Sequence, residues 1–161
     1  MGRIVTCALL LILLPALAEA RKPRCTLRAH LEGNANDGEV FASQIQSQTT
    51  GRSVFIQKAP VISENDVVGF KAYPAADGSF GVLFDLNDHG KLALDTLSVE
   101  KRGTYLYVFI NGKPAAELQI DRRVSDGKLY VASGLSAADI ELMKQQWPAK
   151  SRRDRTSNRQ R

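Results

Sequence analysis

Residues 105–120 read YLYVFINGKPAAELQI, and this stretch carries the clearest folding signal in the chain. Residues 105–110 are all aromatic or aliphatic, as strand residues commonly are, and Ala115–Ile120 forms a second apolar-rich run. Between the two runs, Asn111-Gly112 readily adopts the positive backbone angles that a type I′ turn requires. The stretch therefore predicts a β-hairpin, and antiparallel strands are expected to form the centre of the fold.

Further strands are predicted on both sides of this hairpin, each bounded by turn-forming residues. Thr49–Gly51 reads as a tight turn that joins two of them. The expected strands are Cys25–Glu32, Val40–Gln46, Arg52–Lys58, Val67–Pro74, Phe80–Leu86 and Leu129–Ala132.

Two helices are predicted, one on each side of the hairpin. Asn87 is placed to cap a helix over residues 88–101, and Ser136 to cap a last helix that Pro148 ends. The apolar residues expected to face the core are Leu92, Leu94, Leu97 and Val99 in the first helix, and Ile140, Leu142, Met143 and Trp147 in the last. The order of elements predicts an α+β fold: a small mixed or antiparallel sheet with two main helices packed on one face and a β-rich N-terminal extension.

The first 20 residues have the three parts of a secretory signal peptide. Arg3 is followed by an apolar run over residues 4–14, and Pro15 then leads into a small-residue stretch with possible cleavage sites after Ala18 or Ala20. The run is shorter than the roughly 20 residues that a membrane-spanning helix needs. We therefore expect an exported protein, periplasmic or secreted, without a transmembrane segment after cleavage.

The net charge of +5 comes from the C-terminal tail. Residues 21–149 hold 15 Lys or Arg against 15 Asp or Glu, so this part is neutral. The tail, residues 149–161, has no large apolar side chain and is expected to be disordered. Either it is a solvated terminus, or it contacts an anionic envelope surface through Arg152, Arg153, Arg155, Arg159 and Arg161. Nucleic acid is not an expected partner, because export removes it from reach.

Once the leader is removed, Cys25 is the only cysteine, so no disulfide can form within the chain. It opens a predicted strand, which favours a buried thiol that packs as a small apolar side chain. An intermolecular disulfide is the alternative.

A succession of short motifs between Val61 and Met143 resembles the SecDF family of protein-export subunits, in particular the head subdomain of the first periplasmic domain of SecD. Most of the motifs are turns and caps, and together they follow the order and spacing of that subdomain. They are ISEND (62–66), FDLNDHG (84–90), VFINGK (108–113), VSDG (124–127) and LSAAD (135–139).

Together with the leader and the tail, the resemblance predicts four parts: a signal peptide (1–20), an N-terminal β-rich extension packed on the domain (21–60), a SecD head-like α+β domain (61–148) and the basic tail (149–161). SecD itself spans the membrane and uses proton flow, and no later segment of this chain approaches spanning length. What the resemblance implies for this chain is therefore a head-like fold and a capacity to contact polypeptide.

The sequence offers no convincing catalytic or metal site. Residues 85–90 begin like a calcium loop, but the fifth ligand would be His89 and the twelfth would be Thr96 instead of a glutamate. His30 and His89 are the only histidines, and nothing in the sequence indicates that they activate Cys25. We expect no enzyme activity and no cofactor.

The predicted strand 105–110 places Tyr105, Tyr107 and Phe109 on one face and aliphatic residues on the other. The aliphatic face suits the core. The aromatic face is either covered by the N-terminal strands or forms an exposed stripe that binds a partner. The expected function is non-catalytic binding of polypeptide or of a cell-envelope protein, and the alternative is electrostatic binding of anionic lipid, lipopolysaccharide or peptidoglycan through the tail.

Overall fold

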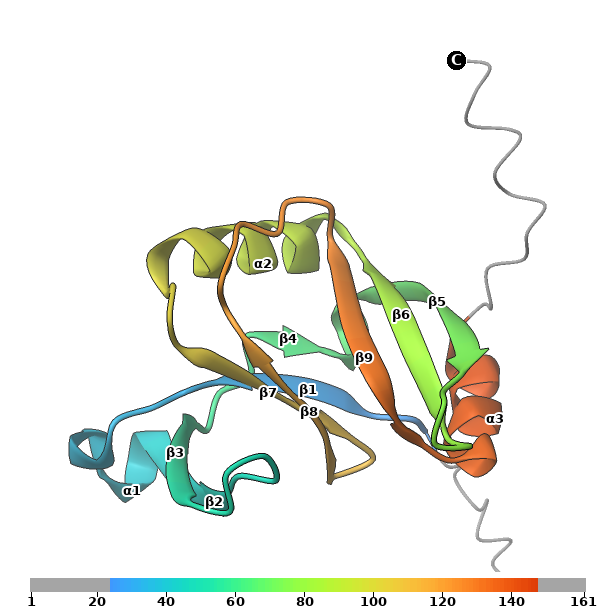
Figure 1. Ribbon diagram of the computed structural model, residues 1–161. Coiled ribbons are helices and arrows are strands. Elements are labelled where there is room, and N and C mark those ends of the chain that lie inside the picture. Colours follow the sequence, from blue (N-terminus) through green and yellow to red (C-terminus); the bar gives the residue numbers. More distant parts are fainter. Residues whose placement is uncertain (1–23, 148–161) are drawn as a thin grey trace, which may run out of the picture.

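The computed structural model describes residues 24–147, which form three antiparallel sheets (Figure 1). A four-stranded sheet has the order β4-β1-β7-β8, with β1 (Leu27–Leu31), β4 (Ile62–Ser63), β7 (Tyr105–Ile110) and β8 (Lys113–Gln119). A three-stranded sheet has the order β5-β6-β9, with β5 (Val67–Pro74), β6 (Phe80–Leu86) and β9 (Lys128–Leu135). A separate hairpin pairs β2 (Ala42–Gln46) with β3 (Ser53–Gln57).

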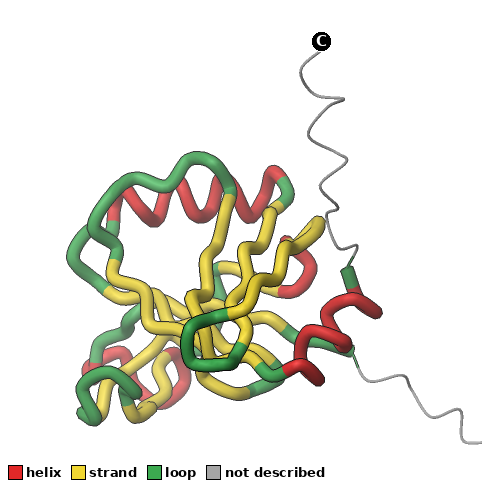
Figure 2. The backbone as a smooth tube through the Cα atoms, turned by 45° about the vertical axis from the view of Figure 1, so that its right-hand side comes forward, coloured by secondary structure: helices red, strands yellow, loops and turns green. Residues whose placement is uncertain are grey.

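Two helices complete the main body, α2 (Asp88–Glu100) and α3 (Ala137–Gln146). Figure 2 shows α2 across the upper end of the molecule and α3 at its lower right side, so the two helices cover different parts of the sheets. The predicted α+β class is confirmed, and every strand pair in the described region is antiparallel.

The β7–β8 hairpin forms as predicted. Asn111 and Gly112 have φ angles of 52° and 74°, as a type I′ turn requires. The Asn111 side chain also links this turn to its surroundings: Oδ1 accepts the Thr26 amide at 3.1 Å, and Nδ2 donates to Asp139 at 2.9 Å. The turn is therefore joined both to the start of β1 and to the first turn of α3.

One hydrophobic core lies between the two larger sheets and the helices. Its fully buried side chains come from strands of both larger sheets and from α3, and include Leu27, Ile62, Phe70, Phe84, Leu106, Val131 and Met143. Strand β1 runs between β4 and β7 and contributes buried side chains to this core, so residues before position 61 are part of it.

The capping residues behave as expected. The Asn87 side chain accepts the Gly90 amide at 2.8 Å, and Ser136 with Asp139 forms a reciprocal capping box at α3. Another capping box, between Ser63 and Asp66, shapes the 3-10 turn Glu64–Asp66 that leads into β5.

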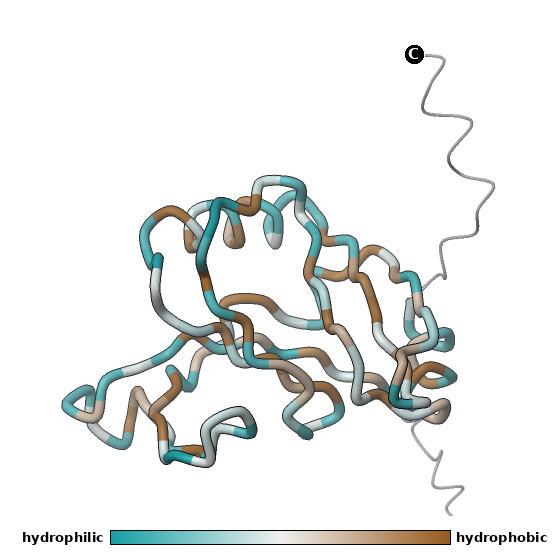
Figure 3. The backbone as a smooth tube through the Cα atoms, in the orientation of Figure 1, coloured by the Kyte–Doolittle hydropathy of each residue, from teal (hydrophilic) through white to brown (hydrophobic). Residues whose placement is uncertain are grey.

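The strand expected at Val40–Gln46 begins two residues later. Gly38–Phe41 instead forms one helical turn, α1, which leaves Val40 and Phe41 at 75% and 69% exposure. The physical reason is local: a capping box between Asn34 and Asp37 starts a helical path, and the Ala42 amide donates to the Gly38 carbonyl at its end. Hydrophobic stretches consequently occur in this outlying part of the chain as well as in the core (Figure 3).

The expectation that four residues of α2 face the core is half wrong. Leu94 and Leu97 are buried, whereas Leu92 and Val99 are 66% and 52% exposed. Side chains three or four residues apart share a helix face, but those two apart point in widely different directions. Leu92 and Val99 each lie two positions from a buried leucine and so turn outward.

Candidate functional site

The aromatic residues of β7 share their face of the sheet with polar residues of the neighbouring strands. In the register, Tyr107 stands opposite His30 of β1 on one side and Glu117 of β8 on the other. Directly opposed residues of antiparallel strands point to the same side. The face therefore combines aromatic rings with a carboxylate and an imidazole.

The β2–β3 hairpin covers this face. Ser47 Oγ donates to Glu117 Oε2 at 2.8 Å, and the Gln48 amide donates to Glu117 Oε1 at 2.6 Å. At the other end, His30 Nδ1 lies 2.8 Å from the Gln57 carbonyl oxygen. Two anchors thus hold the hairpin across the sheet.

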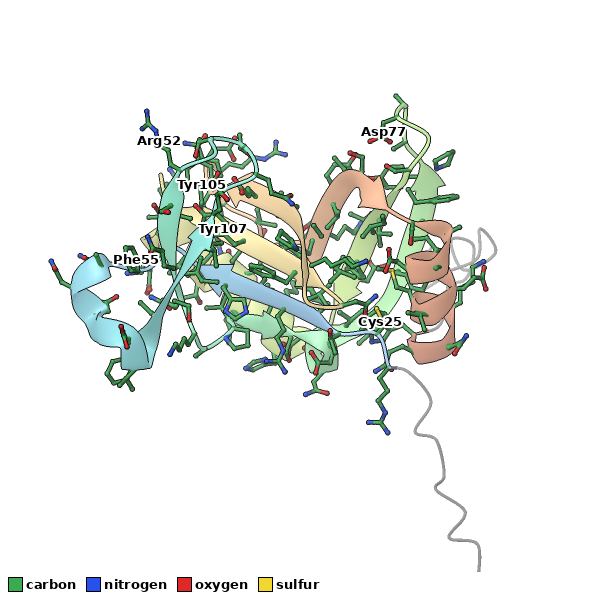
Figure 4. All side chains as sticks on the ribbon, turned by 90° about the horizontal axis from the view of Figure 1, so that it is seen from below. Cys25, Arg52, Phe55, Asp77, Tyr105 and Tyr107 are labelled. Carbon is green, nitrogen blue, oxygen red and sulfur yellow. The ribbon has the colours of Figure 1, made fainter. Side chains whose placement is uncertain are left out.

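The consequence for the predicted stripe is that it is mostly covered. Tyr107 is only 4% exposed, while Tyr105 and Phe109 are half-buried. Figure 4 views this side from below and shows the hairpin, with Phe55, beside Tyr105 and Tyr107. Of the two alternatives for the aromatic face, cover by N-terminal strands matches this arrangement.

Glu117 is held as a carboxylate by its partners. Its partial burial opposes ionisation, but the hydrogen bonds from Ser47, Gln48 and Thr49 outweigh that and lower the pKa of the carboxyl group. Tyr107 responds in the opposite sense: burial, then the nearby Glu32 and Glu117 carboxylates, raise the pKa of its hydroxyl. The hydroxyl of Tyr107 thus lies near two carboxylates, and hydrogen bonds favour the ionised form of Glu117.

A second surface lies between the two larger sheets, where the β8 and β9 edges diverge. It is a pocket of about 370 Å³, within the range of ligand sites. Its floor is aliphatic and its mouth carries charged and polar groups. The lining comprises Leu83, Leu94, Leu97, Ser98, Leu106, Leu118, Gln119, Ile120, Asp121, Arg122, Val124, Asp126, Lys128, Leu129 and Tyr130.

The segment between β8 and β9 borders this pocket and is tied to α2. Arg123 forms a bidentate ion pair with Asp95, with Nε 2.6 Å from Oδ1 and Nη2 2.8 Å from Oδ2. The Val124 amide donates to Ser98 Oγ at 2.9 Å. Paired geometry of this kind fixes orientation as well as distance. The wall of the pocket is thus fastened to the helix behind it.

An aromatic pair on the three-stranded sheet lies at the rim of the pocket, and one of its members, Tyr130, is a lining residue. Tyr73 and Tyr130 stack at 5.7 Å between ring centroids, and Tyr73 Oη donates to the Val131 carbonyl at 2.8 Å. The ring of Tyr73 lies over Gly81, where a Cβ would overlap with it and with the Ala132 carbonyl oxygen. Tyr130 remains 50% exposed and is available to a ligand.

The residues considered for catalysis are not assembled into a reactive group. Cys25 is fully buried, and burial, with a smaller contribution from Asp139, raises the pKa of its thiol to about 11. His30 and His89 are engaged separately, the first with Gln57 and the second with Asp66 at 2.7 Å. Asn87 acts as a helix cap, as its sequence position indicated.

Within residues 24–147, no three His, Cys, Asp or Glu side chains gather as metal ligands would. Nor does any helix in this range have the length and apolar composition needed to cross a bilayer. The predicted signal peptide, and the tail arginines Arg152, Arg153, Arg155, Arg159 and Arg161, lie outside the described residues.

Two features of the surface, the pocket and the exposed Tyr130, were not predicted from the sequence. The pocket depends on how two sheets diverge, which no local pattern reveals. Tyr130 could have been found, because β9 alternates it with the buried Leu129 and Val131.

No protein-family model and no curated protein matches this sequence. Solved structures of SecDF do match its fold over 77% of the chain. One is the structure of SecDF described as a membrane component that enhances protein export, with a TM-score of 0.53, 13% identity and 63% of that chain covered. Another is SecDF in a super-membrane-facing form, with a TM-score of 0.54, 13% identity and 19% of that chain covered.

These likenesses define the class of the fold: a SecD-like α+β domain, as the succession of turn and cap motifs predicted. The chain spans less than two thirds of either SecDF chain, and at 13% identity it is the fold that is shared.

Proposed function

We propose that this protein is a non-catalytic exported protein that uses a SecD head-like domain to bind polypeptide or a cell-envelope protein. The observation that carries the proposal is the shared fold with SecDF, a membrane component that enhances protein export. Fold likeness by itself does not assign function, so the surface must supply the rest of the argument.

The surface supports binding of polypeptide. The pocket between the sheets combines an aliphatic floor with charged groups at its mouth, and Tyr130 stands exposed beside it. Apolar lining with a few orienting polar groups is the usual composition of a recognition site. A chain with exposed apolar side chains could place one in the pocket while its backbone contacts the polar rim.

Site-specific photocrosslinking in living cells tests the proposal. A photoreactive residue replaces Tyr130 at the pocket mouth, and a matched control replaces Glu141 on the exposed side of α3. We expect adducts with exported polypeptides from position 130, above those from position 141. Equal, background-level adducts from both positions would contradict the proposal.

A second candidate function rests on the charge distribution. The five tail arginines, Arg152, Arg153, Arg155, Arg159 and Arg161, with Lys150, carry the whole positive excess of the protein. Each basic residue near an anionic membrane contributes about 1 kcal/mol of attraction. Electrostatic binding to anionic lipid, lipopolysaccharide or peptidoglycan would then use the tail, with the folded domain as its carrier.

Deletion of residues 150–161 separates the two functions. If the tail binds the envelope surface, the deleted protein leaves the membrane and cell-wall fractions and the wild-type association weakens at high salt. If the folded surface binds, association and crosslinking from Tyr130 both persist after the deletion.

A further inference from the structure

We propose that the free edge of β2 binds an extended polypeptide segment by strand addition, with Gln44 and Gln46 supplying the main-chain hydrogen bonds. This inference rests on the proposed function and deepens it by naming a binding mode and its partner: an extended, uncharged stretch of an unfolded chain.

The pairing of β2 with β3 shows which backbone groups are free. The Ser47 amide donates to the Arg52 carbonyl at 2.9 Å, and the Lys58 amide donates to the Phe41 carbonyl at 2.8 Å. Hydrogen-bonded pairs alternate along an antiparallel ladder, so Ser43 and Ile45 also face β3. Gln44 and Gln46 therefore point their N–H and C=O groups away from β3, and β2 pairs with no other strand of the described chain.

The hairpin is fastened to the protein by its other sides. The Gly33 amide donates to the Phe55 carbonyl at 2.8 Å on the outer side of β3, and Glu117 holds the turn. The edge of β2 carries neither contact, and the side chains of Gln44 and Gln46 are exposed. An incoming strand can thus align beside β2 while these anchors remain in place.

The β2 edge also lacks the features by which proteins protect free edges. Residues 40–51 contain no charged residue and no proline, and the β2–β3 register is continuous. Charges, prolines, bulges and short length are the common protections against strand addition. The edge strands of the two larger sheets have such protections. In the four-stranded sheet, β4 is only two residues long, and β8 contains Lys113, Pro114 and Glu117. In the three-stranded sheet, β5 contains Lys71, Pro74 and a register shift, and β9 contains Lys128 and a register shift.

Apolar side chains lie at one end of the free edge. Val40 and Phe41 of α1, the most exposed large apolar residues of the described chain, directly precede β2. In strand addition, main-chain hydrogen bonds provide affinity and contacts with alternate side chains provide selectivity. These two residues would contact apolar side chains of the added strand. The absence of charge along the edge favours an uncharged segment.

Addition of a third strand should stabilise the two-stranded hairpin. Two strands alone are marginally stable in water, and a third strand pairs groups that are otherwise left to solvent. The partner also forms hydrogen bonds on pairing, because an unfolded chain has unpaired backbone groups along its whole length. Unfolded polypeptide is the occupant we infer for this reason.

Residue-resolved hydrogen exchange of the purified protein tests the inference. The probe is a capped peptide of about ten alternating Val and Thr residues with Lys at both ends, which favours an extended strand. Without peptide, the amides of Ser43 and Ile45 should be protected and those of Gln44 and Gln46 should exchange freely. Saturating peptide should slow exchange at Gln44 and Gln46, and unchanged exchange there would overturn the inference.

The double variant Gln44→Pro, Gln46→Pro removes the two outward N–H donors and leaves the β2–β3 bonds intact. Loss of two hydrogen bonds should weaken peptide affinity by about tenfold or more. The matched control, Gln44→Thr with Gln46→Thr, keeps both donors and should bind like wild type. Persistent protection of Ser43 and Ile45 verifies that each variant retains the hairpin.

Two other results would refute this binding mode. Protection of Gln44 and Gln46 that grows with protein concentration, together with dimers on sedimentation, would identify the occupant as a second copy of this chain. Undiminished peptide binding by the proline variant would place the polypeptide elsewhere. In that case crosslinking from Tyr130 could still uphold the proposed function, so the two failures are distinguishable.

Discussion

Two carboxylates, Asp66 and Asp139, each accept several hydrogen bonds and so connect separate parts of the chain. Asp66 accepts hydrogen bonds from the amide and hydroxyl of Ser63, and Oδ1 pairs with His89. Burial opposes its ionisation, yet these bonds outweigh burial and lower the pKa of the carboxyl group. Asp139 behaves alike: burial is outweighed by bonds from Ser136 and Asn111, and its pKa is lowered.

These lowered pKa values predict acid sensitivity. A carboxyl group that ionises more easily in the folded than in the unfolded state stabilises the fold fully above its unfolded pKa of about 3.9. That contribution disappears as pH falls through the folded value. We expect the free energy of unfolding to decline from about pH 5 downward, measured by urea titration at several pH values.

The variant Asp66→Asn measures how much Asp66 contributes to the fall in the free energy of unfolding at acid pH. It should lower stability at neutral pH by about 1–3 kcal/mol, because Asn cannot accept the same bonds, and it should flatten the decline below pH 5. Asp88→Asn, an exposed carboxylate at the start of α2, serves as the control. An unchanged pH profile in Asp66→Asn would contradict the role given to this residue.

Gly81 is required by close packing. A Cβ at this position would overlap with the Tyr73 ring and the Ala132 carbonyl oxygen. We expect Gly81→Ala to destabilise the protein by about 1–3 kcal/mol or more and to disturb the Tyr73–Tyr130 stack. Thermal unfolding and the ring signals of both tyrosines measure the effect, and a wild-type melting temperature would show that the packing is looser than described.

At the scale of elements, the β2–β3 hairpin depends on a few polar anchors. Glu117 accepts hydrogen bonds from the Ser47 hydroxyl and the Gln48 amide at the turn end of the hairpin. Loss of both bonds should loosen the turn end of the hairpin, while the His30–Gln57 and Gly33–Phe55 hydrogen bonds hold its other end and the main core stays intact.

The variant Glu117→Ala tests this arrangement. Hydrogen exchange in residues 42–57 should accelerate several-fold, and Tyr107 should become accessible to solvent, since opening of a weakly held unit precedes global unfolding. Glu100→Ala, an exposed carboxylate at the end of α2, is the matched control. Unaltered exchange in the hairpin would mean that its other contacts, which include the His30–Gln57 and Gly33–Phe55 hydrogen bonds, hold it without Glu117.

Elements marked by local chemistry were predictable from sequence, and those that depend on tertiary packing were not. Asn111-Gly112 and the caps at Asn87 and Ser136 specify their turns and helix starts directly. The α1 turn and the outward rotation of Leu92 escaped prediction, because apolar residues in an outlying turn or on a helix look the same whether buried or exposed.

The candidate site was less predictable still. Strand alternation correctly placed Tyr105, Tyr107 and Phe109 on one face of the sheet. Whether that face is covered or exposed depends on the β2–β3 hairpin, which is distant in sequence. The pocket arises where β8 and β9 diverge, and the free edge of β2 is recognised only once β3 is known to be its one partner among residues 24–147.

At the scale of the whole molecule, we propose an exported binder of unfolded polypeptide. Such a protein must discriminate unfolded from folded chains, because only the former present apolar side chains and unpaired backbone together. Selectivity of this kind, more than capture of any single partner, distinguishes the proposal from electrostatic attachment through the tail.

The most direct measurement is binding of the purified protein to one secretory protein in two states, native and permanently unfolded by reduction and carboxymethylation. The account predicts micromolar affinity, on the order of 8 kcal/mol, for the unfolded form and at least tenfold weaker binding to the native form. That preference should persist in the variant lacking residues 150–161. Equal affinity for both states, or loss of binding with the tail, would contradict it.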